Sequence, residues 1–128
     1  MKKSNNHARV LYIEDNPLNM RLVRKSIKHM GYDVLEAEDA EKGIELAIEE
    51  QPDAILMDLH LPGMSGLEAT KLIKQNPKTK DIPIIALTAD TLGDTYDACI
   101  EAGCSAYLTK PVRSAHLLRI LAQFITFS

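Results

Sequence analysis

Ala54-Ile55-Leu56-Met57-Asp58 is the most telling segment of this chain, because an unbroken apolar run ends in a single carboxylate. An unbroken run of this length is typical of a strand that is buried on both faces, as strands of parallel sheets are. Three more short apolar runs end in polar residues: residues 10–13 lead into Glu14-Asp15, residues 84–87 into Thr88, and residues 106–108 into Thr109-Lys110. Parallel strands place their carboxyl ends at one edge of the sheet, so we expect these polar side chains to gather in one pocket.

Helix signals separate the apolar runs. Asn16 followed by Pro17, and later Asp39 and Ser114, are residues that favour the starts of helices. Gly31 and Gly103 are placed to end helices, the second closing a helix that begins at Gly93 or Asp94. The apolar positions expected to face the core are Leu18, Leu22, Ile27 and Met30, then Ala40, Ile44, Ala47 and Ile48, then Leu67, Leu72 and Ile73, and finally Leu117, Leu118, Leu121 and Phe124.

With a further strand over residues 32–37, the pattern alternates strand and helix five times. This alternation predicts an α/β fold: a doubly wound, five-stranded parallel sheet with helices on both faces. The pattern does not by itself give the order of the strands. We expect one domain over residues 1–128 with a core at about residues 8–126, since 128 residues suffice for a single hydrophobic core.

Composition excludes several classes of protein. The net charge is -3, whereas nonspecific nucleic-acid binding needs a basic face. No apolar run is long enough for a membrane span, and none that would make a signal peptide follows the charged start. Cys99 and Cys104 fit neither a C-x-x-C motif nor a disulfide framework, so we expect a reduced, cytoplasmic protein.

The polar residues at the strand ends point to a metal and a phosphoryl group. Glu14, Asp15 and Asp58 would lie close enough to repel one another, which demands a cation or raises their pKa values. Carboxylates with water and a phosphate oxygen suit Mg²⁺, whereas zinc would want His or Cys ligands. Thr88 and Lys110 would add a hydroxyl and an ammonium group to the same pocket.

Four motifs resemble the receiver domain of two-component response regulators. They are Ile13-Glu14-Asp15-Asn16, the run from Met57 to Gly66 that contains Asp58-Leu59-His60-Leu61-Pro62-Gly63, then Leu87-Thr88-Ala89, and Tyr107-Leu108-Thr109-Lys110-Pro111. The resemblance covers the chain from about Val10 to Phe124. It implies a flavodoxin-like sheet with strand order 2-1-3-4-5.

The resemblance also implies a role for each residue of the pocket. Asp58 would be the phosphoacceptor, taking a phosphoryl group from the phosphohistidine of a histidine kinase or phosphotransfer protein. Asp15, with Glu14 through water, Asp58 and the main-chain carbonyl of His60, would hold Mg²⁺. Lys110 would neutralise charge on the transferring group. The domain would thus catalyse only its own phosphorylation and dephosphorylation, and we do not expect an enzyme acting on other substrates.

A switch is implied as well. Thr88 would bond the phosphoryl group and Tyr107 would turn inward, and the Lys110-Pro111 bond would be cis. Output would pass to a downstream protein through the face formed by the helix closing at Gly103, the strand over residues 106–108 and the last helix. No nucleic-acid or membrane partner is expected, and the protein would be a monomer or a weak dimer. The start at Met1 favours a free-standing receiver over one excised from a hybrid kinase.

Two other functions fit parts of the pattern. A haloacid-dehalogenase-like, Mg²⁺-dependent phosphatase also forms an aspartyl phosphate, but it wants a second acid two residues after the nucleophile, where this chain has His60. A flavodoxin-like flavin binder needs a phosphate loop rich in Ser, Thr and Gly after the first strand. Here that loop contains Glu14-Asp15-Asn16-Pro17, which adds negative charge and removes an amide donor.

Overall fold

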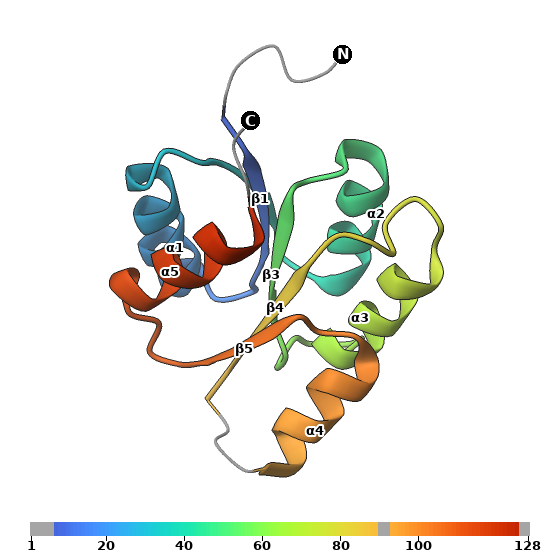
Figure 1. Cartoon of the computed structure of the whole chain (residues 1–128). Helices are drawn as coiled ribbons and strands as arrows, with labels where there is room; N and C mark the ends of the chain where they lie inside the picture. Colours follow the sequence, from blue (N-terminus) through green and yellow to red (C-terminus); the bar gives the residue numbers. More distant parts are fainter. Residues whose placement is uncertain (1–6, 90–92, 126–128) are drawn as a thin grey trace.

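A computed structural model describes residues 7–89 and 93–125 of the chain. The described part forms a parallel sheet in the order β2-β1-β3-β4-β5, with a helix after each strand, which confirms the expected doubly wound fold (Figure 1). The strands are β1 Arg9–Ile13, β2 Asp33–Ala37, β3 Ala54–Asp58, β4 Ile84–Thr88 and β5 Ala106–Thr109. The helices are α1 Pro17–His29, α2 Ala40–Glu50, α3 Gly66–Gln75, α4 Gly93–Ala102 and α5 Ser114–Phe124.

The sheet separates two layers of helices. Helices α1 and α5 cover one face, and α2, α3 and α4 cover the other (Figure 1). Alternate residues of each strand enter the two cores, so that Leu11 and Met57 pack on the α2–α4 side while Tyr12 and Leu56 pack on the α1–α5 side. Every residue of β3 and β4 is buried, as the unbroken apolar runs predicted.

Most of the predicted helix boundaries are confirmed. Asn16 accepts a hydrogen bond from the Asn19 amide at 3.0 Å, and Asp39 accepts one from the Lys42 amide at 2.8 Å. Gly103 follows α4 with φ +110°, and Gly31 lies beyond α1 with φ +97°, so both glycines take the left-handed conformation that favours this residue.

The inner face of α1 was predicted only in part. Ile27 is buried and Met30 is half-buried, as expected, but Leu18 and Leu22 are 54% and 56% exposed, and Met20 is buried in their place. Leu18 lies nine residues before Ile27, which at about 100° per residue puts the two on opposite sides of the helix. The helix phase follows Met20 and Ile27, so the two leucines face outward.

Three smaller corrections concern α3 and α5. Leu72 and Leu118 are each 45% exposed, because each neighbours a residue, Ile73 or Leu117, that takes the buried position. Ser114 does not cap α5: it is the first helical residue, and the capping position is held by Arg113 without a side-chain bond. The Ser114 hydroxyl lies 2.9 Å from that of Ser26 on α1 instead.

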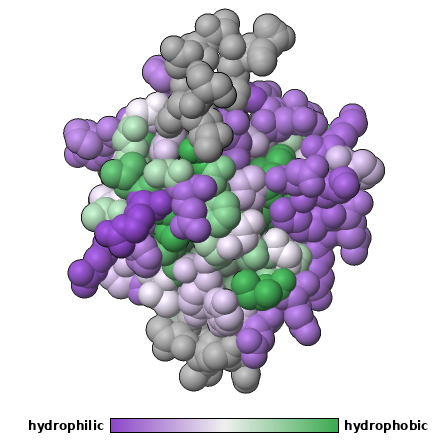
Figure 2. Space-filling view, in the orientation of Figure 1, coloured by the Kyte–Doolittle hydropathy of each residue, from purple (hydrophilic) through white to green (hydrophobic). Residues whose placement is uncertain are grey.

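Apolar and hydrophilic residues are distributed unevenly over the surface. In Figure 2 apolar surface is visible on the side of α1 and α5, whereas the outer side of α2 is mainly hydrophilic. None of the helices in the described part of the chain has the length and apolar character that crossing a membrane requires.

Candidate functional site

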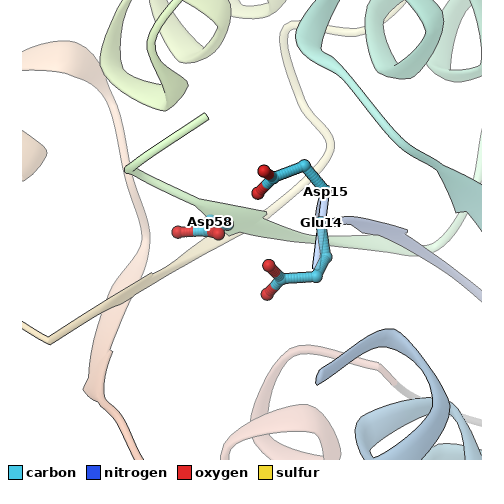
Figure 3. Close-up of side chains that lie close together, drawn as sticks. All are labelled: Glu14, Asp15 and Asp58. Carbon is cyan, nitrogen blue, oxygen red and sulfur yellow. The ribbon is translucent and has the colours of Figure 1, made fainter. Parts of the chain in front are cut away.

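Three carboxylates meet at the carboxyl edge of the sheet. Glu14 and Asp15 follow β1, and Asp58 ends β3, which pairs with β1 in parallel so that Ile13 lies beside Met57. One ligand oxygen of each of the three lies within 4.8 Å of the others. The three side chains project into the same space in Figure 3, with Glu14 and Asp58 buried and Asp15 exposed.

Lys110 brings a positive charge to two of these carboxylates. Its ammonium nitrogen lies 3.2 Å from Asp58 Oδ2 and 3.4 Å from Glu14 Oε1. The Lys110 amide donates to the Thr88 carbonyl at 2.8 Å, which ties the loop after β5 to the end of β4. The Lys110-Pro111 bond is cis, as the resemblance implied.

Glu14 is held by hydrogen bonds from its own strand and the loop that follows. The Tyr12 hydroxyl donates to Glu14 Oε1 at 2.9 Å, and the Asn16 amide donates to Oε2 at 3.2 Å. Burial raises the pKa of the Glu14 carboxyl, and neighbouring Asp58 raises it further, while the donors from Tyr12 and Asn16 act in the opposite direction. The cluster is therefore short of positive charge, which a bound cation supplies.

His60 links Asp58 to Thr88. Its amide donates to Asp58 Oδ1 at 3.0 Å, and its ring Nε2 lies 3.2 Å from Thr88 Oγ1. Thr88 is fully buried at the end of β4. No partner for the His60 ring was predicted from the sequence, so its contact with Thr88 is a finding of the structure.

Tyr107 lies on β5, opposite Ala86 of β4, and is half-buried. Its ring meets that of Tyr96 on α4 edge to face, with the ring centres 5.7 Å apart and the planes at 70°. Tyr96 is 51% exposed. The two aromatic rings therefore connect the strand next to Lys110 with the outer surface of α4.

The structure thus brings together four of the residues singled out in the sequence, Glu14, Asp15, Asp58 and Lys110, and joins Thr88 to them through His60. Sequence reasoning missed Tyr12 and Tyr96. Tyr12 could have been found, because residues two apart in a strand point to the same face, which places its ring below Glu14.

The donor set of this cluster fits Mg²⁺. It offers carboxylate oxygens, the ligands this ion prefers, and no thiolate or imidazole takes part in the cluster. Glu14 and Asp58 are nearly inaccessible to water, with 2% of each residue exposed, so two like charges lie side by side in a poorly hydrated place. Among residues 7–89 and 93–125 this is the one group of three or more acidic, His or Cys side chains arranged to hold a metal.

Known proteins share both the sequence and the fold. The family model of the response regulator receiver domain matches residues 10–122. The polar-differentiation response regulator DivK of Brucella anthropi is 36% identical over 116 residues, which cover 91% of this chain and 94% of that protein.

Two solved structures are similar along nearly their whole length. The receiver domain of a sensor histidine kinase from Pseudomonas aeruginosa, solved with a magnesium ion coordinated in its active site cleft, is 36% identical with a TM-score of 0.87, covering 92% of this chain and 97% of that one. The chemotaxis protein CheY4 of Vibrio cholerae is 27% identical with a TM-score of 0.88, covering 93% and 99%. With its carboxylate cluster at the sheet edge and a family match from residue 10 to residue 122, the chain belongs to the response regulator receiver domains of two-component signalling.

Proposed function

We propose that Asp58 accepts a phosphoryl group from a phosphohistidine of a histidine kinase or phosphotransfer protein, and that this changes a protein-binding surface. The observation that carries the proposal is the position of the Asp58 carboxylate between the acidic pair and Lys110. One of its oxygens faces the Lys110 ammonium at 3.2 Å and the other accepts the His60 amide at 3.0 Å. These contacts hold the Asp58 carboxylate in one orientation.

The transfer is an in-line displacement at phosphorus. The bond from Asp58 to phosphorus forms while the bond from the donor's imidazole nitrogen breaks, and the bonding electrons return to that nitrogen. Asp15, Glu14 and Asp58, with the carbonyl of His60, would hold Mg²⁺, which supplies positive charge to the phosphoryl oxygens when bound. Lys110 already lies beside Asp58 and would stay close to the new phosphoryl group.

Switching would then start at Thr88. In the present state its hydroxyl contacts the His60 ring, and it would reorient to donate to the phosphoryl group. Tyr107 would follow inward and loosen its contact with Tyr96 on α4. A local change of charge would thereby reach the surface of α4.

We place the downstream protein on the face formed by α4, β5 and α5, where Tyr96 and Ile100 are exposed by 51% and 46%. The net charge of -3 favours a protein over a nucleic acid as the partner. The two cysteines are free thiols, which fits work in the cytoplasm, and we expect a monomer or weak dimer there. Relatives include both a free response regulator and a kinase receiver, so either setting fits a single receiver domain.

The phosphatase alternative is not favoured. A haloacid-dehalogenase-like enzyme needs an acid two residues after the nucleophile, and His60 at that position points its ring to Thr88. The proposed domain therefore catalyses only its own phosphorylation and dephosphorylation.

The experiment is intact-mass spectrometry after incubation with acetyl phosphate, with Mg²⁺ or with EDTA. We expect one phosphoryl adduct that requires Mg²⁺ and is absent from the Asp58→Asn variant. Asp81→Asn is the matched control, because Asp81 is exposed and precedes β4 at the opposite edge of the sheet. An undiminished adduct on Asp58→Asn would falsify the assignment of Asp58 as the phosphoacceptor. Turnover of small phosphate esters by the wild-type protein would favour the phosphatase alternative.

A further inference from the structure

We propose that Tyr12 is a positioning residue for the metal site: its buried hydroxyl fixes the Glu14 carboxylate in the orientation that binds Mg²⁺. This inference rests on the proposed function, because it assigns a new residue to the same site. It concerns a side chain of the sheet interior that the transfer chemistry itself does not use.

The contact is set by the strand. Tyr12 and Glu14 are two residues apart, so their side chains leave the backbone toward the same face of the sheet. The Tyr12 ring packs in the core on the α1–α5 side and is completely buried. Its hydroxyl emerges at the end of β1 and donates to Glu14 Oε1 at 2.9 Å. A buried hydroxyl needs such a partner, and Glu14 is the group it reaches.

Glu14 needs this support more than an aspartate would. A glutamate has one more methylene, so its carboxylate has an extra torsion through which it can swing away from Asp58. The repulsion between the two buried carboxylates favours that movement. Burial of Tyr12 raises the pKa of its hydroxyl above the ordinary value, so it remains a protonated donor throughout the neutral range.

The other donors to Glu14 are weaker supports. Lys110 lies 3.4 Å from Glu14 but 3.2 Å from Asp58, so it is shared between two carboxylates. Once Asp58 carries a phosphoryl group, Lys110 would turn to that group. The Asn16 amide remains at 3.2 Å on the other oxygen. Tyr12 is then the one side-chain donor among the described contacts of Glu14 that the reaction leaves in place.

Partners that orient a metal-binding carboxylate or imidazole commonly contribute 10–100-fold to metal affinity. We therefore expect Tyr12→Phe, which keeps the ring and removes only the hydroxyl, to weaken Mg²⁺ binding about tenfold. The maximal rate of phosphorylation by acetyl phosphate at saturating Mg²⁺ should stay near that of the wild type. The Mg²⁺ concentration for half-maximal rate should rise by the same factor as the dissociation constant.

The test is isothermal titration calorimetry with Mg²⁺ on the unphosphorylated protein, with the rate measurement beside it. Tyr32→Phe is the matched control, because Tyr32 is also a buried tyrosine but precedes β2 at the opposite edge of the sheet. The control should bind Mg²⁺ as the wild type does. Because Tyr12→Phe keeps the core filled, an unchanged circular dichroism spectrum shows that it folds, and its change in Mg²⁺ affinity then reports the loss of the hydroxyl.

A double-mutant cycle with Glu14→Ala identifies the route of the effect. If Tyr12 acts through Glu14, removing its hydroxyl in the Glu14→Ala background should change Mg²⁺ affinity less than twofold. An unchanged Mg²⁺ affinity in Tyr12→Phe would overturn the inference, and so would an equal loss in both backgrounds. A wild-type protein that binds no Mg²⁺ and takes up no phosphoryl group would instead overturn the proposed function.

Discussion

Lys110→Met tests the electrostatic balance of the site most sharply. Methionine keeps an unbranched side chain of similar reach but removes the ammonium that faces two carboxylates. The Lys110 ammonium lies 3.2 Å from the Asp58 carboxylate and 3.4 Å from that of Glu14. Each distance corresponds to about 5 kcal/mol of attraction at an effective dielectric constant of about 20, before the cost of desolvation is subtracted. The carboxylate side chains are 3% and 1% exposed, and that of Lys110 is 23% exposed.

Removing one partner of a fully buried ion pair costs about 3–5 kcal/mol, and partial exposure of the lysine lowers this. We therefore expect Lys110→Met to reduce the free energy of unfolding by about 2–3 kcal/mol in EDTA. Saturating Mg²⁺ should shrink that difference, because the ion supplies the missing charge to the same carboxylates.

The assay is urea unfolding followed by circular dichroism at pH 7.5, in EDTA and in Mg²⁺. Lys71→Met is the control: Lys71 is an exposed residue of α3, and a surface substitution of this kind changes stability by no more than about 0.5 kcal/mol. An unchanged or increased stability of Lys110→Met in EDTA would show that the ammonium does not offset the carboxylate charges. A penalty that Mg²⁺ leaves untouched would show that the ion does not bind where we place it.

Three further outcomes follow from the packing around the site. Gly66→Ala should destabilise the fold by about 1–3 kcal/mol and impair phosphorylation, since a Cβ there would lie 2.3 Å from the main-chain oxygen of Asp58. Gly43→Ala should also be destabilising in the same denaturation assay, because its Cβ would lie 2.8 Å from Cγ1 of the completely buried Ile13, but it should leave phosphorylation less affected because the clash is with a side chain of the core. His60→Ala should keep phosphorylation but shorten the lifetime of the adduct in a mass-spectrometric time course, because it removes the ring that lies 3.2 Å from Thr88 Oγ1 and leaves room for water there; an unchanged lifetime would show that the ring does not shield the phosphoryl group. Burial raises the pKa of the Cys104 thiol to about 12 and also raises that of Cys99, so both should react slowly with a disulfide reagent at pH 8 until guanidinium unfolds the chain.

The fold was largely predictable because its strands are short apolar runs. Strand residues that are buried on both sides of a sheet are mostly apolar, and β3 and β4 follow this rule up to their last residues, Asp58 and Thr88. The helix phases were harder. Leu18 and Leu22 satisfy the apolar spacing of a helix, yet Met20 takes the core position on the side of Ile27, and a choice between two overlapping apolar stripes depends on contacts that the sequence does not state.

The site was predictable in its charged members and not in its connections. Glu14, Asp15, Asp58 and Lys110 each end a strand or follow one, so topology alone brings them to one edge. The ring contact between His60 and Thr88 depends on how the loop after β3 turns, and no periodic pattern in the sequence predicts the conformation of that loop. The strand order 2-1-3-4-5 came from resemblance, because the apolar pattern of five similar strands does not rank them.

The most direct test of the central claim locates the phosphoryl group. The protein is phosphorylated with acetyl phosphate and Mg²⁺, reduced with borohydride, which converts an aspartyl phosphate to homoserine, and digested for tandem mass spectrometry. The account predicts homoserine at position 58 and aspartate unchanged at position 15. Homoserine at another position, or an adduct that resists borohydride, would contradict it.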